Sequence, residues 1–90
     1  MSKLNGKVAL ITGASKGMGK SHASIYAKYG ASLILVDLDE SIHEVAAEIK
    51  NTYGVEVLAH VGDVTDPQAM RLIAEKGMQR FCPLNALVWN

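Results

Sequence analysis

A glycine cluster between an apolar segment and an amphipathic one constrains the fold most. Residues 7–12 are apolar and partly β-branched and lack polar alternation, which is typical of a strand covered on both faces. Gly13, Gly17 and Gly19 follow, and a segment with helical spacing begins at Met18. A strand, a glycine turn and a helix in this order predict the first β-α unit of a parallel sheet.

The same alternation continues along the chain, because apolar runs of strand length are separated by stripes with the period of a helix. The loops between these segments are only a few residues long, so each helix serves as the crossover that connects two parallel strands. The order βαβαβαβ therefore predicts an α/β fold with a doubly wound parallel sheet. Further strands are expected over residues 32–37, 55–61 and 85–90, and helices over residues 18–29, 42–53 and 68–80.

Turn residues mark the helix ends. Gly30 and Gly54 stand where left-handed C-caps would end the first two helices, and Asp66 with Pro67 supplies the cap and first turn of the third. Gly77 weakens the third helix without breaking it. The first helix is marked by the spacing of Met18, His22, Ile25, Tyr26 and Tyr29. The core is expected to include Ile42, Val45, Ile49 and Tyr53, together with Met70, Ile73 and Met78.

Composition excludes several classes of function. Nine basic and nine acidic residues give zero formal charge, so the composition shows no electrostatic footprint for nucleic acid or anionic membrane, and neither is expected as a partner. No apolar run approaches the roughly 18 residues of a membrane span, and no signal peptide is apparent. Cys82 is the only cysteine, which excludes an internal disulfide and favours a reducing compartment, the cytoplasm. His22, His43 and His60 share no ligand spacing, so no metal is expected.

The glycines fit a phosphate-binding turn. Gly13 allows a tight turn out of the strand, Gly17 allows close approach of a phosphate, and Gly19 allows the helix to pack against the sheet. A dinucleotide pyrophosphate could then reach the free N–H groups and the positive dipole end of the helix. Strand-to-helix turns also collect glycines without binding a nucleotide, and that alternative remains open.

The pattern TGxxxGxG over residues 12–19 resembles the glycine motif of the short-chain dehydrogenase/reductase family, and the resemblance extends over all ninety residues. It implies a Rossmann-like fold, of which residues 1–90 would be the N-terminal part, incomplete at its C-terminus. It also implies an NAD(P)-dependent oxidoreductase that transfers hydride between an alcohol and a ketone. By the same resemblance, the intact protein would act on a small alcohol or ketone and form a homo-oligomer.

Two residues bear on the choice of cofactor. Asp37 ends the second strand, 18 residues after Gly19, near the offset at which a carboxylate accepts hydrogen bonds from the adenosine ribose and repels a 2′-phosphate. Lys16 argues the other way, since a cation before the second glycine can pair with that phosphate. We therefore expect NAD, with NADP less favoured. Asp37 could equally be a loop residue or help to cap the following helix.

Asp63 and Val64 are similar to the family's Asp-Val pair, which implies that Asp63 lies near the adenine amino group and the Val64 backbone at the ring. The alternative is that Asp63 caps the helix beginning near Asp66. Asn90 matches the second Asn of the family's Asn-Asn-Ala-Gly segment, with Trp89 in place of the first. The complete set of expected cofactor-binding residues is Gly13, Ser15, Lys16, Gly17, Met18, Gly19, Asp37, Leu38, Asp63, Val64 and Asn90.

The family's catalytic Ser and Tyr-x-x-x-Lys pair have no counterpart here. None of Tyr26, Tyr29 and Tyr53 has a lysine four residues later, so no catalytic residue is assigned and the ninety residues alone are expected to be inactive. Two other interpretations remain. The chain could be a non-catalytic dinucleotide-binding or interaction module complete at ninety residues, or an α/β segment that binds no nucleotide.

Overall fold

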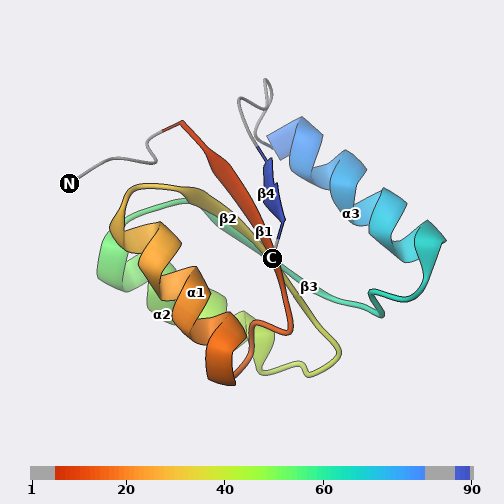
Figure 1. Cartoon of the computed structure of the whole chain (residues 1–90), viewed down its shortest axis with the longest axis horizontal. Helices are drawn as coiled ribbons and strands as arrows, with labels where there is room; N and C mark the ends of the chain where they lie inside the picture. Colours follow the sequence, from red (N-terminus) through yellow and green to blue (C-terminus); the bar gives the residue numbers. More distant parts are fainter. Residues whose placement is uncertain (1–5, 81–86, 90) are drawn as a thin grey trace.

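The computed structural model describes residues 6–80 and 87–89, and in this part of the chain four parallel strands form one sheet in the order β3-β2-β1-β4 (Figure 1). The predicted alternation of strands and helices is confirmed. The strands are β1 (Val8–Thr12), β2 (Ser32–Asp37), β3 (Val57–Val61) and β4 (Leu87–Trp89), and the helices are α1 (Gly17–Lys28), α2 (Ile42–Tyr53) and α3 (Pro67–Arg80).

In the described part of the chain the expected element boundaries are wrong by one or two residues at five places. β1 begins at Val8 and not at residue 7, and α1 ends at Lys28 and not at residue 29. α1 begins at Gly17 and α3 at Pro67, each one residue earlier than expected. β3 begins at Val57 and not at residue 55, because Gly54 ends α2 in the left-handed conformation and its successors lead into the sheet. Pairing with β2 starts where Val57 lies opposite Leu33.

The strand order explains why the helices lie on both faces of the sheet. The chain passes from β1 to β2 to β3 in one direction and then returns across the sheet to place β4 beside β1. Crossovers between parallel strands are right-handed, so reversing the direction puts the connecting helix on the opposite face. Accordingly, α1 and α2 cover one face and α3 lies over the other (Figure 1).

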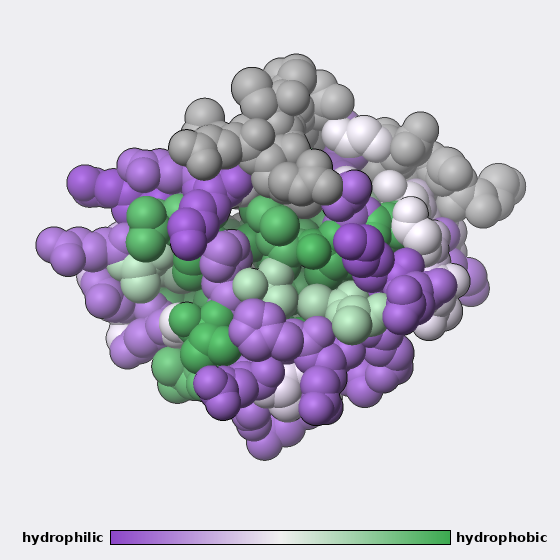
Figure 2. Space-filling view, turned by 180° about the vertical axis from the view of Figure 1, so that it is seen from behind, coloured by the Kyte–Doolittle hydropathy of each residue, from purple (hydrophilic) through white to green (hydrophobic). Residues whose placement is uncertain are grey.

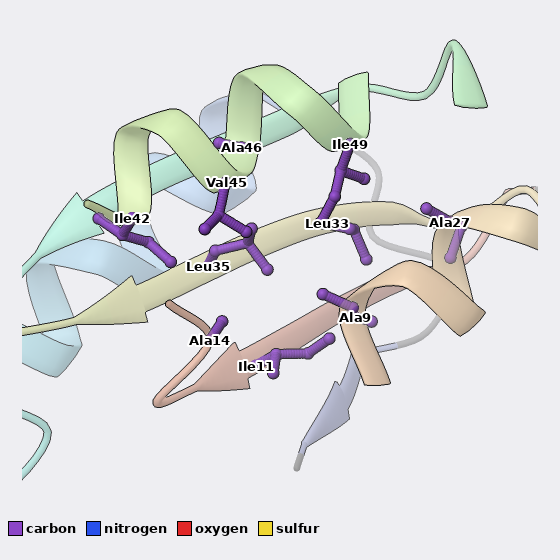
Figure 3. Close-up of a cluster of buried hydrophobic side chains, with 12 residues drawn as sticks. Ala9, Ile11, Ala14, Ala27, Leu33, Leu35, Ile42, Val45, Ala46 and Ile49 are labelled. Atoms are coloured by element: carbon purple, nitrogen blue, oxygen red, sulfur yellow. The ribbon is translucent and has the colours of Figure 1, made fainter. Parts of the chain in front are cut away.

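The larger part of the described core lies beneath α1 and α2. Alternate residues of a strand point to opposite faces, and Ile11, Leu33 and Leu35 face this side. Figure 3 shows Leu33 and Leu35 on β2 beneath Ile42 and Ile49 of α2, with Ile11 on the neighbouring strand β1. Each of these five residues is at most 2% exposed, so this layer fixes how α2 sits on the sheet.

Of the large residues whose spacing marks α1, Tyr26 packs partly buried against the core, but others do not form the inner face of the helix. Ala23 and Ala27 are buried against the sheet, whereas Met18 is 75% exposed and Ile25 is 52% exposed. Small side chains let the helix lie close to the sheet, so the alanines take the inner positions. Tyr53 was also expected in the core, but it is 39% exposed because it lies at the end of α2.

α3 covers a second apolar layer. Ile34 and Val36 point to this side and pack in one cluster with Ile73, which confirms Ile73 as a core residue, and Met70 is partly buried against it. Gly77 lies so close to Ile34 that an added Cβ would come within 2.5 Å of its Cδ1 atom. The side chain of Met78 lies outside the described part.

The surface also separates hydrophobic from hydrophilic residues. Seen from behind, hydrophobic residues gather in the middle of the molecule, with hydrophilic residues at the sides and below them (Figure 2). Among the described residues, no helix combines the length and the apolar character needed to cross a bilayer.

Candidate functional site

The carboxyl ends of β1, β2 and β3 meet at one edge of the sheet, because the three strands are parallel and adjacent. Backbone pairing continues just past the strand ends. The N–H of Gly13 donates to the carbonyl of Val36 at 2.8 Å, and the N–H of Gly62 donates to the carbonyl of Asp37 at 3.0 Å. The loops that follow the three strands are therefore held side by side, where ligands of open α/β sheets bind.

The glycine turn after β1 needs its glycines for conformation and for space. Gly13 and Gly17 have φ angles of +63° and +64°, which residues with a side chain rarely adopt. At Gly19 an added Cβ would overlap the carbonyl of Gly13. The first turn of α1 therefore lies directly against the end of β1.

The N-terminus of α1 is not capped by a side chain. Lys16 occupies the N-cap position in an extended conformation and makes no side-chain capping hydrogen bond, and the first turn holds no acidic residue. The first N–H groups of a helix have no partner within the helix. At this helix they remain available to an anion, with the positive end of the dipole behind them.

Asp37 joins the loop after β2 to the glycine turn. Its Oδ2 accepts the backbone N–H of Ser15 at 3.0 Å, across 22 residues of sequence, and its Oδ1 accepts the N–H of Asp39 at 3.0 Å. Burial alone would raise the pKa of Asp37, but the N–H of Asp39, the nearby hydroxyl of Ser15 and the N–H of Ser15 outweigh burial and lower this pKa. Asp37 is thus an ionised acceptor in a fixed orientation and does not cap α2.

Ser15 is the one buried polar residue of the glycine turn. It is 8% exposed, and its hydroxyl lies near enough to the Asp37 carboxylate to help lower the pKa of Asp37 but forms no hydrogen bond of good geometry with any residue that the structure describes. Buried polar atoms are normally paired, so this hydroxyl is suited to a partner supplied by a ligand.

Asp63 is oriented by a residue of its own loop. Its Oδ1 accepts both the backbone N–H of Thr65 at 2.8 Å and the Thr65 hydroxyl at 2.6 Å. The hydroxyl and then the N–H of Thr65 lower the pKa of Asp63. α3 is capped instead by Asp66, whose Oδ1 accepts the N–H of Gln68 at 3.0 Å. The interpretation of Asp63 as the helix cap is therefore wrong.

The three loops enclose a cavity of about 240 Å³. It combines two carboxylates with two apolar side chains that are unusually exposed, Leu38 at 70% and Val64 at 44%. Within the described part of the chain, no lysine or arginine lines it. The lining residues are Gly13, Asp37, Leu38, Gly62, Asp63, Val64 and Thr65.

Five of the expected residues line this cavity, and most of the others lie beside it in the turn and at the start of α1. The N–H of Ser15 reaches Asp37, whereas Lys16, Gly17, Met18 and Gly19 stand at the helix N-terminus outside the lining. Asn90 lies outside the described residues. Sequence reasoning missed Gly62 and Thr65; a signal for Thr65 was its place two residues after an aspartate, where a hydroxyl can bond that carboxylate. No group of three or more histidine, cysteine, aspartate or glutamate side chains suited to a metal occurs in residues 6–80 or 87–89.

Comparison with known proteins identifies the family. The profile described as "short chain dehydrogenase" matches residues 7–90. The chain belongs to the short-chain dehydrogenase family. This membership confirms the resemblance carried by the glycine motif and accounts for the Rossmann-like sheet.

Individual short-chain dehydrogenases resemble the whole chain. Oxidoreductase UcpA of Escherichia coli (strain K12) is 38% identical over 90 residues, which cover 100% of this chain and 34% of UcpA. The solved structure of L-sorbose reductase from Gluconobacter frateurii, complexed with NADPH and L-sorbose, has a TM-score of 0.87 at 36% identity and covers 96% of this chain and 33% of that one. Carveol dehydrogenase from Mycobacterium avium, in complex with NAD, has a TM-score of 0.86 at 27% identity and covers 97% and 36%.

The chain therefore spans about a third of the length of the short-chain dehydrogenases that it matches. The matched third contains the glycine turn and the cavity. The solved relatives were determined with NADPH or with NAD, so a nicotinamide dinucleotide is the ligand to test against this site.

Proposed function

We propose that this chain is the cofactor-binding part of an NAD-dependent oxidoreductase that interconverts an alcohol and a ketone. The observation that carries the proposal is the cavity at the carboxyl edge of the sheet, where Asp37 is held by Ser15 beside the uncapped N-terminus of α1. Family membership supports the class of reaction.

The cavity has the chemistry of a nucleoside site. Asp37 and Asp63 are acceptors, suited to the hydroxyl groups of a ribose and the amino group of a base. Leu38 and Val64 expose apolar surface that a flat ring would cover. The unpaired hydroxyl of Ser15 is a further polar group that a ligand could satisfy.

The pyrophosphate would bind at the start of α1. The N–H groups of the first turn are not taken by a capping side chain, and Gly17 and Gly19 carry no side chain that would block the approach. Met18, exposed next to these glycines, would contact the same part of the ligand.

NAD is favoured over NADP by charge. A 2′-phosphate on the ribose would meet the ionised Asp37, whose pKa is already lowered, and the described cavity lining offers no cation to offset the repulsion. Lys16 is the nearest cation in sequence, but it lies at the N-cap of α1 and not in the lining. NADP is therefore the weaker ligand in this proposal.

When bound, NAD would supply the chemistry by accepting or donating a hydride. The residues of this chain would bind and orient the dinucleotide. The ninety residues contain no tyrosine followed by a lysine four positions later, so we propose that they alone bind cofactor without turning over substrate. For the intact protein we propose a small alcohol or ketone substrate, a homo-oligomeric state and a cytoplasmic location.

The first experiment is isothermal titration of the intact protein with NAD and, separately, with NADP. We expect saturable binding of NAD, with NADP binding at least about tenfold more weakly, which corresponds to ~1.4 kcal/mol. A reversed preference would overturn the role of Asp37. No saturable binding of either dinucleotide would overturn the proposed function as a whole and would favour an α/β segment that binds no nucleotide.

A further inference from the structure

His60 on β3 has a buried imidazole nitrogen outside the cavity. Alternate residues of a strand face opposite sides of a sheet, and Val57 and Ala59 pack with the core beneath α2. The side chain of His60 therefore faces the side of α3, where its register partner Val36 packs in one cluster with Ile73. In the part of the chain that the structure describes, the Nε2 atom of His60 is buried and has no hydrogen-bond partner. The contact between the sheet and α3 thus contains a titratable group.

The groups around His60 disfavour its protonation. An imidazolium carries a proton on both ring nitrogens, so protonation places a charge and an unpaired donor at this buried position. Burial is the main cause that lowers the pKa of His60, and the positive charges of Lys76 on α3 and His43 on α2 lower this pKa further. β2 presents the apolar Val36 on this side of the sheet. A protonated His60 is therefore repelled from the position that the neutral side chain occupies.

Few residues hold α3 on the sheet. Of residues 67–77, only Ile73 and Gly77 are buried, and Ala69 and Met70 are partly buried. Elements with few buried apolar contacts are among the first to move or open locally. A charge at His60 therefore acts at a contact that yields easily.

The loop between β3 and α3 connects this contact to the cavity, because residues 62–65 are part of the cavity lining. One end of the loop is held on the sheet, where the N–H of Gly62 donates to the carbonyl of Asp37 at 3.0 Å. The other end is held on α3, since the N–H of Asp66 donates to the carbonyl of Asp63 at 3.1 Å and the Asp66 carboxylate caps the helix. A displacement of α3 therefore moves Asp63 relative to Asp37.

We propose that His60 is a pH-sensitive contact between the sheet and α3, and that its protonation displaces α3 and weakens the binding of a dinucleotide in the cavity. The inference rests on the proposed function, since it assigns the dinucleotide to this cavity. The cavity carboxylates do not produce the effect, because the pKa of Asp37 and that of Asp63 both lie below the ordinary value of 3.8. Coupling is reciprocal, so a bound dinucleotide also makes His60 harder to protonate.

The test is titration calorimetry of the intact protein with NAD at pH 7.5 and at pH 5.0. We expect NAD to bind about threefold or more weakly at pH 5.0. Near pH 6 its binding should release a fraction of a proton, measured in buffers of different ionisation enthalpy. His60→Phe does not titrate, so it should bind NAD with similar affinity at both pH values and release no proton. His60→Gln is a second variant that does not titrate, for use where the phenyl ring disturbs the packing.

Two lysine variants separate a titrating contact from structural support. Lys76→Gln removes a positive charge that opposes protonation of His60, so the loss of NAD affinity should begin at a higher pH. Lys50→Gln is the matched control, because Lys50 is exposed on α2 and its charge is not among those that lower the pKa of His60. It should leave the pH of the loss at its wild-type value.

Each result bears on one of the two proposals. Equal affinity of the wild type at both pH values overturns the coupling, and so does an equal acid loss in the His60 variants, while the proposed function stands. An unchanged pH of the loss in Lys76→Gln also overturns the role of His60. If the wild type does not bind NAD at pH 7.5, the proposed function has failed and this inference fails with it.

Discussion

The two aspartates of the cavity are held in different ways. Asp37 is held at Oδ1 by the N–H of Asp39, two residues away, and at Oδ2 by a donor 22 residues away, so its second contact depends on β1 and β2 being correctly paired. Asp63 is fixed by a donor only two residues away. A change that loosens the sheet should therefore disturb Asp37 before it disturbs Asp63.

Asp37→Ala should change the cofactor preference of the intact protein. The variant loses an acceptor for the ribose hydroxyls and also loses the charge that repels a 2′-phosphate. We expect NAD binding to weaken about tenfold or more, a loss of ~1.4 kcal/mol, while NADP binding weakens less or improves. Titration calorimetry with both dinucleotides measures the ratio directly.

Asp39→Ala is the control for this prediction. Asp39 is an exposed carboxylate two residues away that does not line the cavity, and its Oδ1 accepts the N–H of Ser41. It should leave the ratio of the two affinities unchanged. Equal losses of NAD and NADP in Asp37→Ala would contradict a role at the ribose.

Much of the glycine turn could be predicted at the scale of single residues. A positive φ at Gly13 and close packing at Gly19 follow from a spacing that few other turns share. Thr65 could not be predicted as firmly, because its role depends on a side-chain rotamer that brings the hydroxyl onto Asp63. Sequence spacing makes such a bond feasible but does not select it over contact with water.

At the scale of elements, the period of a segment predicted a helix more reliably than it predicted the buried face. α2 presents Ile42, Val45 and Ile49 to the sheet as expected, because large apolar residues occupy one stripe. On α1 Met18 and Ile25 face outward, Tyr26 is only partly buried against the core, and the alanines take the fully buried positions. The distance between helix and sheet determines which side chains fit between them. The close approach of α1 at Gly19 leaves room only for small side chains there.

Asp66→Ala should destabilise α3 specifically at its first turn. The Asp66 carboxylate accepts the N–H of Gln68 at 3.0 Å, and losing a cap of this kind costs about 0.5–2 kcal/mol. Urea unfolding of the intact protein, followed by circular dichroism, would measure the loss. Glu75→Ala, at an exposed position of the same helix, is the control and should change the free energy of unfolding by less than about 0.5 kcal/mol. Equal effects of the two substitutions would contradict the capping role.

At the scale of the whole molecule, the protonation of His60 on β3 is affected by charged residues on both α2 and α3. Its Nε2 is buried without a partner among the described residues. Burial lowers the pKa of His60 below its ordinary value of 6.5, and the positive charges of Lys76 on α3 and His43 on α2 lower this pKa further. The folded protein therefore resists protonation that the unfolded chain accepts.

This resistance predicts a loss of stability in mild acid. Well above pH 6.5 His60 is neutral in both states. Around and below pH 6.5 the unfolded chain binds a proton first, so the free energy of unfolding falls as the pH drops toward the folded-state pKa. His60→Phe should flatten this fall. Urea unfolding of the intact protein at pH 7.5, 6.5 and 5.5 compares the two proteins, and an identical pH dependence would contradict the prediction.

Because the strands are parallel, the sheet has one edge where the strands end, which carries the cavity, and an opposite edge where they begin, which carries only connecting turns. All the described cavity residues stand at the carboxyl ends of β1, β2 and β3, whereas the Gly30 and Gly54 turns stand at the opposite ends of β2 and β3. A strand of five or six residues spans ~17–20 Å, so the two edges do not touch. Substitutions at the carboxyl edge can therefore change which ligand binds without affecting the turns at the opposite edge. Conversely, insertions or labels at the Gly30 and Gly54 turns should leave ligand binding unchanged.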